Sequence, residues 1–346
     1  MKALFYLGPR HLELRDIEIP VPGENEVLLR VLATGICGSD VHGYLGITGR
    51  RLPPMIMGHE FCGSIESIGR AVTQYRPGER VVVQPVIFCG ECAFCQQGLT
   101  NLCTNKRFLG VLDCNGSMAE YLSVPEKLLY RIPDSLDDTL GAMVEPLAVA
   151  YRAVSGVTDL IEGSRVIVVG AGTIGLLLLV LAKFYGARSI VVSDVNEARL
   201  SLAERIGADL SVNAGGSDLA ASLREATSGN GADVAFEAVG ITATVEQAMS
   251  CLRPGGTCVW VGNSQKDVQV NMQASVTREL RVRGSYIYSH DEFGQALKVL
   301  QDERIDIRPI ISKIVTLQDA ATMFSTLSEP RTELAKVVIS ESKPSK

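Results

Sequence analysis

Two short stretches of the chain carry residues that commonly bind a catalytic metal ion. GICGSDVH contains Cys37, and GHE contains His59 and Glu60. A thiolate and an imidazole are typical Zn²⁺ ligands, and a catalytic zinc takes three protein ligands and leaves a fourth position open. The third ligand is expected to be Glu60 or a more distant carboxylate such as Glu145, while Asp40 can accept the second N–H of His59. Taken singly, the cysteine fits a core thiol and the histidine a structural residue, but together they favour a metal site.

The segment CGECAFCQQGLTNLC predicts a second metal site of the structural type. Thiolates hold Zn²⁺ tetrahedrally, and four of them leave no position for a water to be activated. An iron–sulfur cluster and a redox dithiol are the alternatives, but the ferredoxin-type spacing has a proline after its last cysteine, where this chain has Thr104. The expected ligands are Cys89, Cys92, Cys95 and Cys103.

The sequence SRVIVVGAGTIG is typical of a dinucleotide-binding turn, because it follows an apolar strand and opens a helix. Gly170 permits the tight turn, Gly172 lets the backbone approach a pyrophosphate, and Gly175 lets helix and strand pack closely. The next strand ends at Asp194, which can accept hydrogen bonds from the adenosine ribose and would repel a 2′-phosphate. NAD is therefore favoured over NADP, although Arg199 could weaken that preference. The alternative is a doubly wound domain with ordinary turn glycines.

These motifs lie on two different kinds of secondary structure. The first 150 residues read as short β-branched strands with turns, which predicts a small antiparallel barrel or sandwich. From about residue 145, where Pro146 is expected at a first helical position, strands and helices alternate as in a parallel doubly wound sheet. TCVWVG is expected to be an edge strand of that sheet. After one more helix, a tail of short strands resembles the first region. The predicted domains are therefore 1–150 with 286–346, and 151–285 inserted between them.

Composition limits the function classes. The chain has 346 residues, is 46% hydrophobic and carries a net charge of −6, which argues against nucleic acid as the main partner. The longest apolar run, IGLLLLVLA, is too short to span a bilayer. No export signal is recognisable, so the cytoplasm is the expected location. Nine cysteines in such a chain indicate metal binding rather than a disulfide framework.

In combination, GICGSDVH, GHEFCGSI, the four-cysteine segment, MVEPLAV, VGAGTIG and SDVNEARL resemble the zinc-dependent medium-chain dehydrogenases over almost the whole chain. The resemblance is strongest to the polyol branch, which includes sorbitol, xylitol, butanediol, threonine and galactitol-phosphate dehydrogenases. It implies a GroES-like β-barrel catalytic domain and a Rossmann NAD-binding domain. It also implies two zinc ions per subunit, one catalytic and one structural, and a dimer or tetramer.

The resemblance assigns roles to single residues. Cys37, His59 and Glu60 match the catalytic zinc set, and Glu145 matches a second carboxylate that binds the zinc directly or through its water. Ser39 matches the hydroxyl that takes the substrate proton, and His42 the residue that relays it to solvent. Tyr44, Glu145 and Tyr288 match substrate-pocket positions. Cofactor contacts are implied for Gly170, Gly172, Thr173, Ile174, Gly175, Asp194, Arg199, Val261, Gly262, Asn263, Ser285, Tyr286 and Ile287.

Two positions depart from the sorbitol dehydrogenases. Gly43 stands where they carry a tyrosine, and Ile287 where they carry an arginine, and both of those residues contact the polyol in that branch. A less polar or differently shaped secondary alcohol or polyol is therefore expected, oxidised to the ketone or ketose with NAD. Alternatives are a threonine or phosphorylated-polyol dehydrogenase, and a cofactor-binding protein without catalysis. The end of the chain, ELAKVVIS, also departs from the usual glycine–lysine pattern.

Overall fold

The chain folds into two compact units in the computed structural model, which describes all residues except 157–160, 216–221, 223–228, 330–331 and 342–346. The barrel unit comprises Met1–Glu145, Ser289–Gln301 and Ile311–Lys346. The sheet unit comprises Pro146–Tyr288 and Asp302–Ile310. The sheet unit is thus inserted in the chain of the barrel unit.

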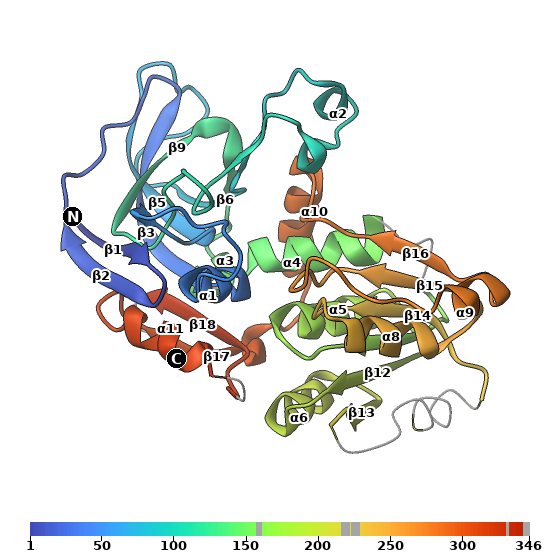
Figure 1. The fold of residues 1–346 in the computed structure, drawn as a ribbon. Helices are drawn as coiled ribbons and strands as arrows, with labels where there is room; N and C mark the ends of the chain where they lie inside the picture. The colour runs from blue at the N-terminus through green and yellow to red at the C-terminus, as the bar shows by residue number, and fades with distance from the viewer. Residues whose placement is uncertain (157–160, 216–221, 223–228, 330–331, 342–346) are drawn as a thin grey trace. The chain divides into compact units, whose positions relative to one another are not determined.

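Three sheets build the barrel unit (Figure 1). The largest has the order β10-β6-β5-β3-β18-β17, with β9 also paired to β3, and all its pairs are antiparallel except β17 with β18. The others are β2-β1-β4 and β7-β8. Strand bounds are β1 (Lys2–Gly8), β2 (His11–Asp16), β3 (Glu26–Ile36), β4 (Met55–Ile56), β5 (Glu60–Ile68), β6 (Arg80–Val83), β7 (Val86–Ile87), β8 (Arg107–Phe108), β9 (Tyr121–Pro125), β10 (Leu129–Arg131), β17 (Ile311–Val315) and β18 (Lys336–Ser340).

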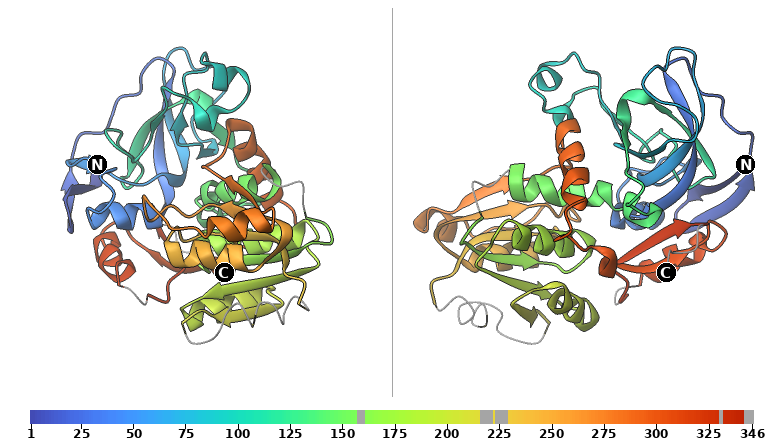
Figure 2. Two further views of the ribbon diagram at one scale, coloured as in Figure 1. Left: turned by 45° about the vertical axis from the view of Figure 1, so that its right-hand side comes forward. Right: turned by 180° about the vertical axis from the view of Figure 1, so that it is seen from behind.

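The C-terminal strands complete this unit beside N-terminal ones. Strand β18 pairs antiparallel with β3, with Val337 opposite Ile36, and Figure 2 shows these red and blue segments side by side. The buried side chains of β3 and β5 include Leu29 and Phe61, which belong to one apolar cluster of the unit. The alternating apolar pattern therefore predicts the strands well, because one face of each is buried.

The barrel unit also contains helices that the sequence pattern did not predict. Their bounds, with those of the predicted helix α10, are α1 (Gly38–Tyr44), α2 (Ala93–Gln96), α3 (Asp138–Gly141), α10 (His290–Leu300) and α11 (Ala320–Leu327), with 3₁₀ turns η1 (Thr100–Leu102) and η2 (Glu126–Leu128). Most are too short to show a helical hydrophobic period. The expectation of a tail made only of strands is wrong. Helix α11 lies between β17 and β18 in the sequence and packs Phe324 into an apolar core of the unit.

The sheet unit is a parallel doubly wound sheet with the order β13-β12-β11-β14-β15-β16. In order of sequence this is 3-2-1-4-5-6, the Rossmann arrangement. Strand bounds are β11 (Arg165–Val169), β12 (Ser189–Asp194), β13 (Leu210–Asn213), β14 (Ala232–Glu237), β15 (Leu252–Trp260) and β16 (Arg281–Gly284). The predicted fold class is confirmed. The first four residues of TCVWVG, however, lie in β15, which pairs on both sides, so the edge strands of the described sheet are β13 and β16.

Helices connect these strands and cover both faces of the sheet, as right-handed crossovers require (Figures 1 and 2). Helix α6 ends at Gly207, whose φ of +114° gives a left-handed closure of the kind that glycine favours. Helix α4 begins at Val144, so Pro146 is its third residue, where a missing N–H still costs no intrahelical bond. Bounds are α4 (Val144–Tyr151), α5 (Thr173–Phe184), α6 (Glu197–Ile206), α8 (Thr242–Ser250) and α9 (Met272–Thr277), with a π-turn η3 (Arg152–Gly156) and a 3₁₀ turn η4 (Arg308–Ile310).

In the part of the chain that the structure describes, every helix is too short or too polar to cross a membrane.

Candidate active site and metal centres

The end of β3 and the start of β5 bring the first predicted metal ligands together. Cys37 follows β3 as the N-cap of α1, and Glu60, the first residue of β5, pairs with Gly35 of β3. Ligand atoms of Cys37, His59 and Glu60 all lie within 4.8 Å of one another. Gly35 is required there, because a Cβ at this position would be 2.1 Å from Oε2 of Glu60. Cys37 is thus brought to His59 and Glu60, which lie 22 and 23 positions later in the sequence, and the three form one donor cluster of the kind that zinc prefers.

The surroundings of His59 favour a cation at this cluster. Its Nδ1 lies 3.6 Å from Oδ1 of Asp40, which leaves Nε2 as the ligand nitrogen. Burial alone would lower the pKa of His59, but the charges of Asp40 and Cys37 raise it well above its ordinary value. Burial likewise would raise the pKa of Asp40, yet His59 and Arg51 hold it well below its usual range. The buried anionic groups therefore stabilise positive charge, which a bound metal ion supplies, so the residues present fit zinc.

Lys336 is a member of this cluster that the sequence analysis missed. It is buried in β18, and its Nζ donates to both carboxylate oxygens of Glu60, at 2.8 and 2.6 Å, and to the carbonyl of Ile36 at 3.2 Å. Burial by itself lowers the pKa of Lys336, but Glu60, Cys37 and Glu145 raise it above the ordinary value. A lysine at the start of the apolar segment KVVIS could have revealed it, because all five residues of this strand are buried.

Glu145, the alternative zinc ligand, lies in the first turn of α4 and is buried. It is the last residue of the first segment of the barrel unit. Its carboxylate does not belong to the 4.8 Å donor group, but its charge acts on Lys336. The structure therefore places both candidate carboxylates near the same buried lysine, with Glu60 directly paired to it.

The predicted proton-transfer residues lie on α1, immediately after Cys37. Ser39 is exposed, and its Oγ accepts a hydrogen bond of 3.2 Å from Nη2 of Arg51. His42 is half-buried, and burial lowers its pKa, so the neutral imidazole prevails near pH 7. Sequence analysis places Tyr44 at the substrate. In the structure Tyr44 is buried, with its ring 5.5 Å from that of Phe324 and its hydroxyl 3.3 Å from Oγ of Ser325, and its role at the substrate stays a prediction.

The four predicted structural ligands also come together, around α2 and η1, on a loop that projects from the strands of the barrel unit (Figure 1). Their sulfur atoms lie within 4.8 Å of one another. Backbone N–H groups of Cys95 and Thr104 lower the pKa of Cys92 to about 6, whereas burial raises the pKa of Cys95 to about 12. Four clustered sulfurs, one of them already stabilised as thiolate, fit a closed zinc site.

The glycine-rich turn joins β11 to α5 in the sheet unit. Gly170 has a φ of +100°, and a Cβ at Gly175 would be 1.7 Å from the carbonyl oxygen of Gly170, so both positions require glycine. A Cβ at Gly172 would meet open space. Gly172 is the N-cap of α5, so Thr173, Ile174 and Gly175 form the first turn, whose free N–H groups suit a phosphate.

Asp194 ends β12 and braces this turn. Its Oδ2 accepts a hydrogen bond of 2.6 Å from the N–H of Ala171, and its Oδ1 one of 2.9 Å from Asn196. Arg199 lies in the first turn of α6, where its N–H is bonded to Oδ1 of Asn196. The carboxylate is therefore fixed beside the glycine-rich turn, as a ribose contact requires.

The remaining predicted cofactor residues follow strands of the same sheet. Val261, Gly262 and Asn263 follow β15, and Ser285, Tyr286 and Ile287 follow β16. These segments share the carboxyl edge of the sheet with the glycine-rich turn, the edge at which such folds bind ligands.

Glu237, which the sequence analysis missed, organises this edge at the end of β14. Its Oε1 accepts bonds from the N–H groups of Val239 and Gly240 at 2.9 and 2.7 Å. Its carbonyl accepts bonds from Val261 and Gly262. A buried acid at the end of an apolar strand is the signal that could have revealed it.

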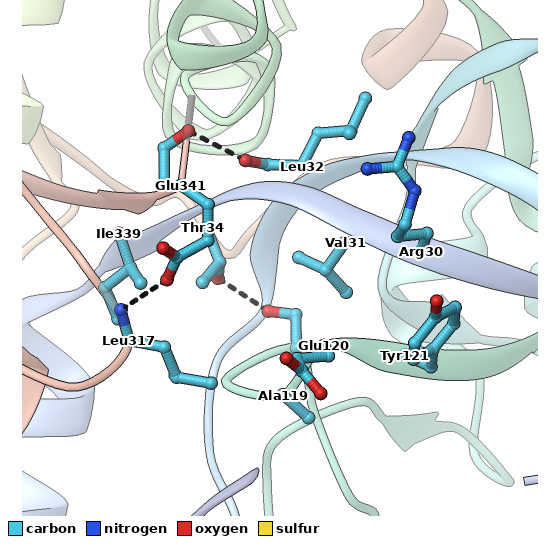
Figure 3. Close-up of a pocket in the computed structure, with 12 residues that line it drawn as sticks. Arg30, Val31, Leu32, Thr34, Ala119, Glu120, Tyr121, Leu317, Ile339 and Glu341 are labelled. Carbon is cyan, nitrogen blue, oxygen red and sulfur yellow. Dashed lines mark hydrogen bonds between the residues drawn. The ribbon is translucent and has the colours of Figure 1, made fainter. Parts of the chain in front are cut away.

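A cavity of about 250 Å³ lies elsewhere in the barrel unit, beside β3 and β18 (Figure 3). Thr34 and Ser117, whose hydroxyl oxygens are 2.6 Å apart, line it, as do Ser340 and Glu341. Ser340 donates to the carbonyl of Leu32 and Glu341 accepts from the N–H of Leu317. Its lining contains none of the ligand, proton-transfer or cofactor residues predicted from the sequence, and we assign it no role.

Comparisons with known proteins agree with this geometry. Residues 23–134 match the model of the alcohol dehydrogenase GroES-like domain, and residues 173–302 that of the zinc-binding dehydrogenase. The sorbitol dehydrogenase of Bacillus subtilis is 31% identical over 98% of this chain and 97% of its own length. The L-idonate 5-dehydrogenase of Vitis vinifera is 33% identical over 94% and 90%.

The chain belongs to the zinc-dependent medium-chain alcohol dehydrogenases. A solved structure supports this, that of a zinc-binding dehydrogenase from Sinorhizobium meliloti bound to NADP. It is 34% identical, covers 98% of both chains and has a TM-score of 0.90. This dehydrogenase of the polyol branch is thus an oxidoreductase of alcohols or polyols that uses zinc and a nicotinamide cofactor, and the non-catalytic alternative is wrong.

Proposed function

We propose that this dehydrogenase oxidises a secondary alcohol or polyol to the ketone or ketose with NAD, using one catalytic and one structural zinc ion per subunit. The observation that carries the proposal is the donor cluster of Cys37, His59 and Glu60, with a second buried carboxylate, Glu145, acting on the same lysine, in one chain with a complete dinucleotide-binding turn. A donor set of sulfur, nitrogen and oxygen with an open position suits catalysis, whereas four sulfurs suit structure.

Cys37, His59 and Glu145 are proposed to hold the catalytic zinc. Both oxygens of Glu60 are already engaged by Lys336, and breaking a buried ion pair is costly. Glu145 is buried in the first turn of α4, and its charge acts on Lys336, so it is the other carboxylate near the cluster. Glu60 then acts as a charged neighbour of the zinc and not as its resident ligand.

Proton transfer is assigned to the two polar residues of α1. When bound, the zinc ion polarises the substrate hydroxyl and lowers its pKa, and the nicotinamide ring takes the hydride. Oγ of Ser39 accepts the substrate proton while its own proton leaves toward His42. The neutral imidazole of His42 then passes a proton to solvent, as its lowered pKa permits.

NAD is proposed over NADP because Asp194 occupies the ribose side of the glycine-rich turn. Its carboxylate is held in place by two backbone N–H groups, and a carboxylate at this position would repel a 2′-phosphate. The related protein from Sinorhizobium meliloti was solved with NADP. The preference of this chain for NAD over NADP is therefore to be measured directly.

The substrate is proposed to differ from sorbitol. Position 287 is an isoleucine, with φ of +42°, where an arginine would donate to polyol hydroxyls. A dimer or tetramer is also proposed, for which the unpaired edge of β16 is a candidate joining surface.

A substrate panel tests the proposal directly. Reduction of NAD and NADP is followed with secondary alcohols, diols, sugar alcohols, threonine and phosphorylated polyols, before and after removal of metal and after return of zinc. The expected result is activity with NAD on an unphosphorylated alcohol that is lost with the metal and restored by zinc. Activity confined to threonine or to a phosphorylated polyol would contradict this substrate class, and no activity on any alcohol would contradict the proposed function.

A further inference from the structure

Arg51 is a buried cation that the family motifs do not include. It lies between α1 and β4, only 5% of its surface is exposed, and its side chain is 2% exposed. A guanidinium is always charged, and a buried one must have a specific counter-charge. Its neighbour Arg50 is exposed, which makes the burial of Arg51 a local feature of the fold.

One nitrogen of Arg51 contacts two groups of the candidate active site. Nη2 donates to Oδ1 of Asp40 at 2.7 Å and to Oγ of Ser39 at 3.2 Å. The same Oδ1 of Asp40 lies 3.6 Å from Nδ1 of His59. Arg51 therefore connects the proposed proton acceptor to the carboxylate behind a proposed zinc ligand.

Gly43 provides the space that Arg51 fills. A Cβ built on Gly43 would be 2.3 Å from Cγ of Arg51 and 3.4 Å from its Cβ. Gly43 stands where the sorbitol dehydrogenases carry a tyrosine, but this need not enlarge the substrate pocket. The aliphatic part of the Arg51 side chain occupies the volume next to Gly43. Any larger residue at position 43 would displace the guanidinium.

The contact with Ser39 has a direct chemical consequence. A serine hydroxyl has one hydrogen and two acceptor sites. Because Arg51 can only donate, it occupies one acceptor site and directs the Ser39 hydrogen elsewhere, which leaves the second acceptor site for the substrate hydroxyl. Its positive charge also favours the state in which the substrate has lost its proton.

We propose that Arg51 is a positioning residue for proton transfer, which holds the Ser39 hydroxyl as an acceptor and fixes Asp40 behind His59 in the space left by Gly43. This inference rests on the proposed function, because it assigns the role of Arg51 within the same oxidation. Arg51 itself offers no zinc ligand, because a guanidinium only donates hydrogen bonds.

The test compares Arg51→Met and Arg51→Lys with the matched control Arg50→Met. For each, kcat is measured between pH 6 and 10 on the best substrate of the wild type, together with zinc content and the Kd for NADH. Arg51→Met is expected to lower kcat about tenfold near pH 7. It should also move the acid limb of the profile to higher pH, because removal of a positive charge disfavours the deprotonated substrate.

The other measurements separate positioning from structural support. Zinc content and NADH binding are expected to be unchanged, Arg51→Lys to lose less activity than Arg51→Met, and Arg50→Met to match the wild type. An equal loss at every pH, or a loss in proportion to missing zinc, would overturn the proposal. An inactive wild type would instead overturn the proposed function, so the two failures differ.

Gly43→Ala covers the case in which Arg51→Met does not fold, and a double-mutant cycle with Arg51→Ala tests whether the two positions act together. Gly43→Ala keeps the charge and should displace the aliphatic part of Arg51, giving the same shift of the acid limb to a smaller extent. In an Arg51→Ala background, Gly43→Ala should have no further effect. Additive effects in this double-mutant cycle would show that Gly43 and Arg51 act separately and would overturn the assignment.

Discussion

The two units of the molecule hold their functional groups by different means. The barrel unit uses buried charged side chains, in which Lys336 pairs with Glu60 and Arg51 with Asp40. The sheet unit uses backbone geometry, since Gly170 and Gly175 shape the turn and carboxylates of Asp194 and Glu237 bind backbone N–H groups. A metal site needs fixed side-chain donors, whereas a pyrophosphate needs close approach of the backbone. The first unit should therefore be sensitive to loss of charge and the second to added volume.

Cys37→Ser should give the largest effect, because it removes a ligand from the charged cluster. The expected loss of kcat/KM is on the order of a thousandfold, which corresponds to about 4 kcal/mol of transition-state stabilisation. Zinc content should fall from the proposed two ions to one per chain, and affinity for NADH should not change. Cys114→Ser, at a buried thiol outside both donor groups, is the control and should retain both ions.

Lys336→Met should test whether the buried charges depend on each other. Leaving Glu60 buried without its partner is expected to cost about 3–5 kcal/mol of the free energy of unfolding. Glu60→Gln in the same chain should recover part of this loss, as denaturant titration of the single and double variants would show. A single variant as stable as the wild type would mean that the pair contributes little to folding.

Gly175→Ala should test how sensitive the sheet unit is to added volume, because the substitution changes no charge. The added methyl would lie 1.7 Å from the carbonyl oxygen of Gly170, and such overpacking is expected to cost about 1–3 kcal/mol. NADH binding should weaken while both zinc ions remain. Gly172→Ala, where a Cβ meets open space, is the control for folding and should leave the thermal midpoint near that of the wild type.

Asp194→Ser should have the smallest effect and should act on cofactor choice. Loss of a charged acceptor for the ribose is expected to lower kcat/KM for NAD about tenfold, and removal of the negative charge should raise kcat/KM for NADP. Kinetics with both cofactors at one ionic strength measure this. An unchanged ratio would show that other residues set the preference.

The sequence predicted local features of both units well and long-range pairings poorly. Strand β12 ends at Asp194 and α5 begins in the glycine-rich turn, as predicted, because apolar runs and glycine turns are local signals. The four-cysteine segment is equally local. By contrast, the Lys336–Glu60 pair joins residues 276 positions apart, and no pattern within either segment indicates it.

Helices α1 and α11 show a second limit. Helix α1 has seven residues and begins at Gly38, directly after its N-cap Cys37. The side chains of Cys37 and Asp40 accept hydrogen bonds from backbone N–H groups at this end. Such side-chain caps stabilise a helix that has no hydrophobic period to reveal it. Arg51 escaped notice for a related reason, because an arginine in a polar loop gives no sign that Gly43 leaves room to bury it.

The place of β18 in the chain constrains how the molecule is made. Strand β3 pairs with β18, which is synthesised about 300 residues later. Lys336, whose charge balances Glu60, belongs to that same strand. Such non-local pairing slows folding and leaves a growing chain with an exposed strand edge. The inserted sheet unit, whose pairings are nearer in sequence, can fold first, so the metal cluster is among the last parts of a newly made subunit to mature.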